Sequence, residues 1–291
     1  MLLITEIYMS TQIKDPTIVH PIDVPHKARA QFEMFAPKLR KLVIPPHIEE
    51  LVQRGALFAV SHSAGKDSQA MLLALRAYKI PDAQIILIHA DLGEVEWEGN
   101  IDHIQNYGFG YPLIIAKARR GLLQMIEERG MFPSPSIRQC TSDLKRGPIE
   151  RELRRFLKRN PQYNKLLVNC MGFRAQESSA RAKRNPFTFN QKNSKAGREW
   201  FDWLPIHAWS EQEVFGYIAQ MGQKPHWAYA KGMSRLSCCF CIMASVSDLT
   251  ISARENPKLY AIYVKLEKKI NHTLSMSRKG LEEITGIKIN Q

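Results

Sequence analysis

A run of small and hydroxyl side chains around one lysine is the most chemically informative segment of this sequence. It reads Ser61-His62-Ser63-Ala64-Gly65-Lys66-Asp67-Ser68, between the apolar stretch 56–60 and the helix-like stretch 69–75. A strand, a small-residue loop and a helix in that order present backbone N–H groups to an anion. It is not a Walker A motif, because Val60 replaces the first glycine and Asp67 the Ser or Thr. Rather than an ordinary turn, we predict a phosphate-binding loop that uses Ser61, Ser63, Ala64, Gly65, Lys66, Asp67 and Ser68.

Two further motifs follow predicted strands. Asp91, in the segment 89–93, either contacts a nucleotide or caps a common Asp-x-Gly turn. In the segment 172–181, Arg174 and Arg181 would hold phosphate through forked hydrogen bonds, and Glu177 would orient Arg181 at the i,i+4 spacing. The alternative for this segment is a surface helix with weak ion pairs. Because both motifs fall at the same sheet edge as the loop, we favour nucleotide binding by Asp91, Gly172, Arg174 and Arg181.

The cysteines indicate a second chemistry. Cys238 and Cys241 form a C-x-x-C pair that encloses Cys239, and Cys140 lies far upstream. Thiolates that meet in space bind Zn²⁺ or an iron–sulfur cluster. Three or four cysteines from separated segments suit a [4Fe–4S] cluster better, since no second C-x-x-C is present. The alternative is packing with one reactive thiol that carries a persulfide. Cys170 follows a predicted strand and is expected to be a small buried residue.

The segment 63–68 resembles the S-G-G-K-D-S pyrophosphate loop of the PP-loop ATP pyrophosphatases and the PAPS reductase family, with Ala64 in place of one glycine. The segments 89–93, 138–145, 172–181, 204–210 and 232–241 resemble other elements of that family in the same order. The resemblance covers roughly residues 55–245. It implies attack on the α-phosphate of ATP with Mg²⁺ present. Lys66 would then stabilise the departing pyrophosphate, and Asp67 would position Mg²⁺ indirectly.

The segments around Cys140 and Cys238 resemble those of PAPS reductase relatives that include the Dnd-type and Ssp-type DNA phosphorothioation enzymes. By that resemblance Cys140, Cys238 and Cys241 would bind a [4Fe–4S] cluster. Cys239 would be either its fourth ligand or a catalytic thiol. The resemblance also implies a cysteine desulfurase as the sulfur donor.

Short apolar strands alternate with amphipathic helices along most of the chain. We predict strands at 56–60, 84–89, 113–116 and 165–169, and helices at 68–78, 97–107, 120–129, 149–158, 211–221 and 257–269. This alternation is typical of an α/β fold with a doubly wound parallel sheet. Ser210 is a predicted helix N-cap with Glu213 as its partner, and Trp209 a predicted core residue. The polar stretch 182–199 is predicted to be a mobile loop that bound nucleic acid orders.

The charge is concentrated in one part of the chain. Residues 145–198 hold fifteen Lys and Arg and three Glu, which is nearly the whole net charge of +13. Such a field favours a polyanion, DNA or tRNA, over a basic face that only confers solubility. No apolar run reaches the ~20 residues that span a membrane. The first residues lack a basic segment, so we expect a cytoplasmic protein without a signal peptide, and the sequence is compatible with a homodimer.

We predict three parts: an N-terminal extension at 1–45, a PP-loop ATP pyrophosphatase domain at 46–210, and a helical C-terminal region with the cysteine cluster at 211–291. The leading hypothesis is a sulfurtransferase that adenylates a nucleic-acid oxygen and replaces it with sulfur, with DNA phosphorothioation ahead of tRNA thiolation. A PAPS or APS reductase is the alternative, disfavoured because such enzymes use a cysteine near the C-terminus and none follows Cys241 here. A non-catalytic nucleotide-sensing module is disfavoured by the intact Lys66 and the cysteine set.

Overall fold

The core of the molecule is one sheet in the order β3-β2-β1-β4-β6-β5. Adjacent strands are parallel except for β5 against β6. The computed structural model describes residues 44–289. The strands are β1 (Leu57–Ser61), β2 (Ile85–Asp91), β3 (Leu113–Lys117), β4 (Leu166–Met171), β5 (Phe187–Phe189) and β6 (Glu199–Trp203). The predicted doubly wound α/β fold is confirmed, and its four predicted strands are β1 to β4, each within two residues of the expected bounds.

Helices connect the strands and follow the sheet. They are α2 (Pro46–Gln53), α3 (Lys66–Ala77), α4 (Asn100–Tyr107), α5 (Leu122–Arg129), α6 (Gln139–Thr141), α7 (Gly147–Arg159), α8 (Ser179–Ala182), α9 (Glu211–Gln220), α10 (Val246–Glu255), α11 (Pro257–Ile270) and α12 (Leu281–Thr285). A π-helical turn, Ser142–Arg146, joins α6 to α7. Each predicted helix is present, and the sequence analysis missed α2, α6, α8, α10 and α12.

One prediction is wrong. The stretch 182–199 is not a single mobile loop, because it contains β5 and the start of β6. The turn between these strands is held by Asn190, whose amide donates to Asp202 (2.8 Å) and whose Oδ1 accepts the N–H of Asn193 (3.1 Å). Polar side chains that bond the backbone here replace the apolar alternation that would have marked a strand.

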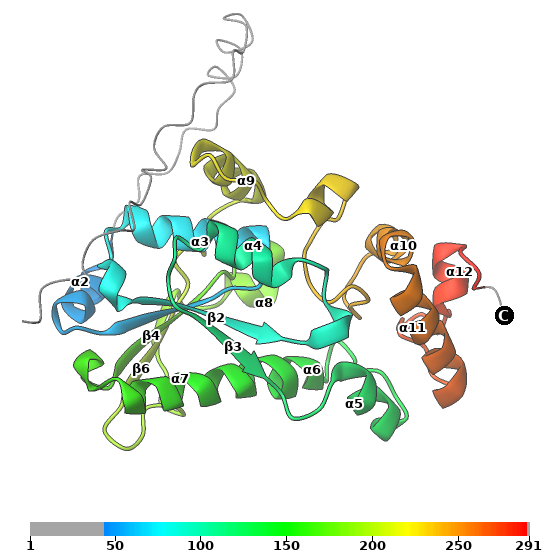
Figure 1. Ribbon diagram of the computed structural model, residues 1–291, viewed down its shortest axis with the longest axis horizontal. Helices are drawn as coiled ribbons and strands as arrows, with labels where there is room; N and C mark the ends of the chain where they lie inside the picture. Colours follow the sequence, from blue (N-terminus) through cyan, green and yellow to red (C-terminus); the bar gives the residue numbers. More distant parts are fainter. Residues whose placement is uncertain (1–43, 290–291) are drawn as a thin grey trace, which may run out of the picture. The chain divides into compact units, whose positions relative to one another are not determined.

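Both faces of the sheet are covered (Figure 1). Alternate residues of β1 point to opposite faces: Phe58 and Val60 pack with α3, while Leu57 and Ala59 pack with Leu153 of α7. The α3 face also includes Val214, Tyr217 and Ile218 of α9, which we had assigned to the C-terminal region. Trp209 and Cys170 are buried in that core, as predicted.

A separate apolar cluster forms beyond the sheet. Helices α5, α10, α11 and α12 pack there around the cysteine segment, with Phe240, Tyr260 and Tyr263 among its fully buried side chains. Figure 1 shows these last helices grouped together after the sheet. Cys238 and Cys239 therefore lie in a core separate from that of the sheet. This core borders the carboxyl end of β2, where the Cys239 N–H donates to the Val95 carbonyl (2.9 Å).

The chain crosses from β3 to β4 on the opposite side of β1. This reversal creates a crevice at the carboxyl ends of β1 and β4, where doubly wound sheets bind ligands. The loop 61–66 and the segment 171–177 both lie there. The N-terminal extension predicted at 1–45 lies outside the described residues except for 44 and 45.

Candidate functional site

The loop after β1 is held in shape by its own side chains. Ala64 adopts a left-handed conformation with φ of 60°, which explains why related loops carry glycine at this position. Its N–H donates to His62 Nδ1 (3.1 Å), and the Ser63 N–H donates to Ser68 Oγ (3.2 Å). Burial, followed by the nearby His103 and His89, lowers the pKa of His62 to about 3. The imidazole is therefore neutral at physiological pH, and its Nδ1 can accept the loop N–H.

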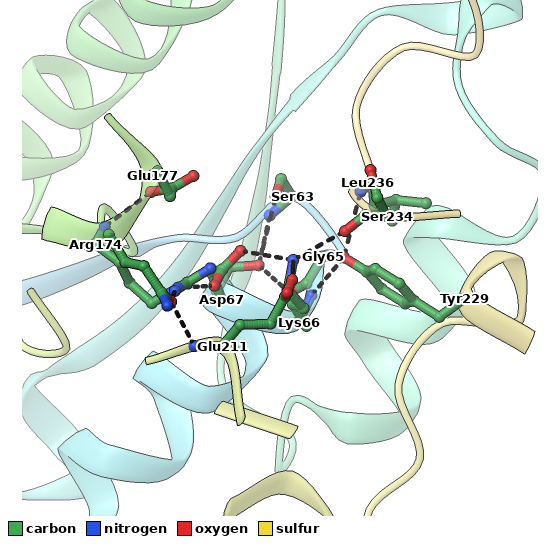
Figure 2. Close-up of polar contacts among 12 residues, drawn as sticks. Ser63, Gly65, Lys66, Asp67, Arg174, Glu177, Glu211, Tyr229, Ser234 and Leu236 are labelled. Atoms are coloured by element: carbon green, nitrogen blue, oxygen red, sulfur yellow. Dashed lines mark hydrogen bonds and ion pairs between the residues drawn. The ribbon is translucent and has the colours of Figure 1, made fainter. Parts of the chain in front are cut away.

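Lys66 begins α3 and turns its ammonium group into the site. Its side chain is 3% exposed and contacts Glu211 (3.1 Å) and Asp67 (3.5 Å). The Lys66 Nζ also donates to the Ser234 carbonyl (3.3 Å) and lies over the rings of Phe215 and Tyr229 (Figure 2). The helix N-terminus and this ammonium therefore place positive charge at one point, as an anion site requires.

Arg174 connects β4 to the first turn of α3. Its Nε donates to Asp67 Oδ1 (2.5 Å), and its side chain is only 4% exposed. The backbone of Gly172 passes so close to Asp67 that a Cβ on Gly172 would lie 3.0 Å from the Asp67 carbonyl. This close approach of two backbones is the steric reason for a glycine at position 172, and a nucleotide contact by Gly172 stays a prediction. Arg174 therefore braces Asp67, and its contact with a phosphate stays a prediction.

Glu177 links the two arginines of the predicted motif. Its carboxylate accepts the Arg174 N–H (2.8 Å) and pairs with the Arg181 guanidinium, which confirms the expected i,i+4 pair. The Arg181 guanidinium lies 4.5 Å from the ring centre of Phe173. A chain of contacts connects it to the loop: Arg181 pairs with Glu177, Glu177 accepts the Arg174 N–H, and Arg174 pairs with Asp67. The capping box between Ser210 and Glu213 is also confirmed, by N–H to Oε2 (2.6 Å) and N–H to Oγ (3.2 Å) contacts.

Two predicted nucleotide contacts are engaged elsewhere. Asp91 Oδ1 accepts the Gly93 N–H (2.7 Å), and its Oδ2 pairs with Lys117 (2.8 Å). This is the Asp-x-Gly turn that we gave as the alternative for Asp91. The Ser61 hydroxyl lies 3.2 Å from Asn169 Oδ1 and thus faces β4 rather than the loop.

The sequence analysis missed Tyr229. Its hydroxyl accepts the Lys66 N–H (3.1 Å) and the Leu236 N–H (3.3 Å), so it covers the loop where a phosphate oxygen would bind (Figure 2). Burial raises the pKa of Tyr229, so the hydroxyl stays protonated. Glu211 and Phe215, which surround Lys66, were also missed. None of them has a local signal, because their contacts join segments more than a hundred residues apart.

Three cysteines predicted as ligands, Cys140, Cys238 and Cys241, influence one another electrostatically and share Lys145 as a neighbour. Burial raises the pKa of the Cys238 thiol, and Lys145 partly opposes that effect. Burial likewise raises the pKa of Cys239, whose side chain is fully buried. Burial also raises the pKa of Cys140, so without a metal the thiols of Cys140, Cys238 and Cys239 are protonated at neutral pH, and metal binding would have to displace their protons.

The surroundings of the Tyr263 hydroxyl indicate whether the cysteine residues suit an iron–sulfur cluster. It is buried, has no hydrogen-bond partner among the described residues, and its pKa is raised first by burial and then by all four nearby cysteines. An unpaired hydroxyl beside four sulfurs fits a site that accepts anionic sulfur. Between residues 44 and 289, however, no three His, Cys, Asp or Glu side chains are placed to hold one metal ion. The type of donor fits a cluster, but Cys140, Cys238 and Cys241 are not gathered closely enough in this structure to hold one ion together.

Magnesium has little protein ligation to draw on here. The Asp67 carboxylate is engaged on one oxygen by Arg174 and on the other by Lys66. Mg²⁺ would therefore be held mainly by the nucleotide phosphates, as is usual for this ion, with Asp67 acting through its neighbours. In the part of the chain that is described, no helix is long and apolar enough to cross a bilayer.

The chain is similar to several known proteins. An uncharacterized 37.8 kDa protein of Escherichia phage 186 is 30% identical over 152 residues, or 52% of this chain, and the chain spans only 43% of its length. A Candida glabrata FMN adenylyltransferase has a TM-score of 0.45 at 13% identity, over 68% of this chain and 58% of its own. A Candida auris PAPS reductase has a TM-score of 0.43 at 15% identity, over 75% of this chain and 97% of its own.

A U34-tRNA thiolase of Methanococcus maripaludis, solved with its [4Fe–4S] cluster, has a TM-score of 0.37 at 15% identity, over 84% of this chain and 88% of its own. The phosphoadenosine phosphosulfate reductase domain matches residues 58–244, from the second residue of β1 to just after the cysteine segment. That span covers well over half of the sequence and contains both the loop and the cysteines. The chain therefore belongs to the phosphoadenosine phosphosulfate reductase domain family.

Proposed function

We propose that this protein is an ATP-dependent sulfurtransferase that adenylates an oxygen of a nucleic acid and replaces it with sulfur. The DNA backbone is the leading substrate and a tRNA base the second. One observation carries the proposal: Tyr229 and Ser234, in the segment that leads to Cys238, contact Lys66 directly. These contacts support a single site in which the phosphate loop and the cysteines act together.

The reaction has two displacements. The nucleic-acid oxygen attacks the α-phosphorus of ATP, the bond to the β-phosphate oxygen breaks, and pyrophosphate leaves. Hydrosulfide then attacks the activated phosphorus or carbon, the bond to the AMP oxygen breaks, and AMP leaves with one proton released. Persulfide sulfur from a cysteine desulfurase reaches the sulfide level with two electrons from a thiol reductant.

The residues of the loop would carry the first displacement. When Tyr229 moves away, the Lys66 N–H is free to bind the charge that develops on pyrophosphate, and the ammonium of the same residue would lie beside that charge. Asp67, held by Arg174, keeps the ammonium oriented. Arg174 and Arg181 lie on the β4 side of the loop and would contact phosphate on that side.

Cys140, Cys238 and Cys241 would hold a [4Fe–4S] cluster, which supplies a binding site for sulfide when present. Cys239 lies next to them and would be the fourth ligand or a thiol that carries sulfur. Lys145 adds positive charge beside the thiols and would favour both thiolate ligands and an anionic sulfur. A basic substrate face is supplied by α7, where Arg155, Lys158 and Arg159 are exposed.

The test uses anaerobically prepared protein with ATP, sulfide and either a DNA oligonucleotide or tRNA. We expect AMP and pyrophosphate in equal amounts only when nucleic acid is present, and a phosphorothioate dinucleotide in the mass spectrum of the digested DNA. A thionucleoside from tRNA instead would identify the second substrate. Pyrophosphate release that does not depend on nucleic acid would refute the proposal.

The family match favours one other activity, reduction of PAPS or APS. That reaction forms sulfite and leaves ATP untouched. Sulfite production from PAPS with a thiol reductant, together with no pyrophosphate from ATP, would establish it in place of sulfur transfer.

A further inference from the structure

A cavity of about 450 Å³ is lined by residues between 118 and 151, none of which belongs to the nucleotide loop. The turn after β3, the π-helical turn 142–146 and the first turns of α7 form its walls. Its charged lining residues are Arg119, Arg120, Arg151 and Asp143, so cations outnumber anions. Its size is within the usual range for pockets that bind small molecules.

Two of the arginines are fixed in place. Arg120 donates to Glu128 (2.6 Å) and lies 3.9 Å from Asp143. Arg151 donates to the Lys117 carbonyl (2.6 Å) and pairs with Glu152 (2.9 Å). Their planes are therefore positioned before any ligand arrives, and each keeps N–H groups for a further acceptor.

Arg119 differs from them. It is exposed, and within residues 44–289 no hydrogen bond or ion pair engages it. A guanidinium with all its donors free at the edge of a cavity can bind a phosphate through two parallel hydrogen bonds.

The remaining lining is apolar. Ala118, Leu144 and Pro148 contribute it, and Leu144 and Pro148 are buried. A flat apolar ring can lie against such a surface, and guanidinium planes also stack on bases. An apolar floor with a cationic edge matches one unit of a nucleic-acid strand, the base inside and the phosphate at the edge.

The cavity is adjacent to the proposed sulfur site. Cys140 is in α6, which continues into the π-helical turn that supplies Asp143 and Leu144. A spacing of three to four residues along a helix is about one turn. π-Helical turns of this kind are frequent at functional sites. A strand that docks here would therefore run next to Cys140.

We propose that this cavity docks one nucleotide of a nucleic-acid strand, with Arg119 on its phosphate. The inference rests on the proposed function for the purpose of the docking, and its physical test does not need the reaction. Fluorescence anisotropy without ATP measures binding of labelled single-stranded DNA and RNA of the same sequence, and of the DNA duplex.

Arg119→Glu should weaken strand binding at least tenfold. Arg119→Ala should make the slope of log affinity against log salt less steep by the amount that corresponds to about one phosphate contact. The matched control is Arg254→Glu, with the same charge change on an exposed residue of α10 that does not line the cavity and lies outside the basic segment 145–198. It should weaken binding less than threefold. Both variants should keep the thermal stability of the parent protein, since neither side chain has a structural contact.

Equal losses in Arg119→Glu and Arg254→Glu would overturn the inference, because they would indicate only a diffuse field. Competition by free AMP at the affinity of the strand would also overturn it, in favour of a small-molecule pocket. A protein that binds strands through Arg119 and releases no pyrophosphate would refute the proposed function and keep this inference. Thiolation at full rate by Arg119→Glu would refute this inference alone.

Discussion

Replacement of Tyr229 by Phe tests whether its hydroxyl occupies the place of a nucleotide phosphate. The hydroxyl accepts two backbone N–H groups, from Lys66 and Leu236. The variant leaves both donors without this acceptor in the unliganded protein. A buried unpaired donor costs about 1–3 kcal/mol. Because Tyr229 is only half-buried, water can reach part of the site, and we expect a total loss near the lower end, about 1–2 kcal/mol.

The nucleotide-bound form should not suffer this loss, because a phosphate oxygen takes the place of the hydroxyl. Binding of a non-hydrolysable ATP analogue should therefore become tighter by the same free energy, which is about 5-fold to 30-fold in the dissociation constant. Isothermal titration calorimetry measures this affinity directly. The unliganded variant should also melt a few degrees lower, at roughly 2–4 °C per kcal/mol for a chain of this size.

Tyr260→Phe is the matched control. The Tyr260 hydroxyl bonds the Ile287 carbonyl (2.6 Å) and Thr285 (2.8 Å) in the C-terminal helical cluster. Its loss should lower the melting temperature without a change in ATP affinity. If Tyr229→Phe binds the analogue no more tightly than the parent protein, the hydroxyl does not compete with phosphate and the placement of the nucleotide is wrong.

Three other outcomes are expected. Lys66→Met, which keeps the volume of the buried stem, should reduce pyrophosphate release by about 100-fold or more in a quenched-flow assay, and near-parental turnover would contradict the role of the ammonium. Cys238→Ser should abolish the visible absorbance of reconstituted iron–sulfur protein, while Cys170→Ser, a buried cysteine in β4, should retain it; equal absorbance in both would exclude Cys238 as a ligand. Since folding lowers the pKa of His62 from 6.5 to about 3, the unfolded chain binds its proton first, so the free energy of unfolding should fall as the pH drops below 6.5, by up to about 1.4 kcal/mol per pH unit. His62→Asn, which can still accept the Ala64 N–H, should flatten that decline in urea titrations between pH 6.5 and 4, and an unchanged slope would show that His62 is not its source.

Local patterns in the sequence were sufficient to predict much of the fold. The four apolar runs became β1 to β4 because alternate residues of strands such as 57–61 had to be buried on two faces. The capping box at Ser210 and the pair of Glu177 with Arg181 followed from spacings of three and four residues, which are set within a single turn. The loop at 63–68 was found because a strand, small residues and a helix are consecutive in the chain.

Contacts between distant segments depended on the tertiary structure. Tyr229 contacts Lys66 across more than 160 positions, and Cys140 influences Cys238 electrostatically across nearly a hundred, so no local pattern records either pair. The short strand β5 forms because β6 offers a free edge, although its own three residues are too few to predict it. Local residue order determined which elements form and where each motif falls on them. The packing of the sheet crevice against the cysteine core, which depends on the summed burial of many side chains, decided which motifs share one site.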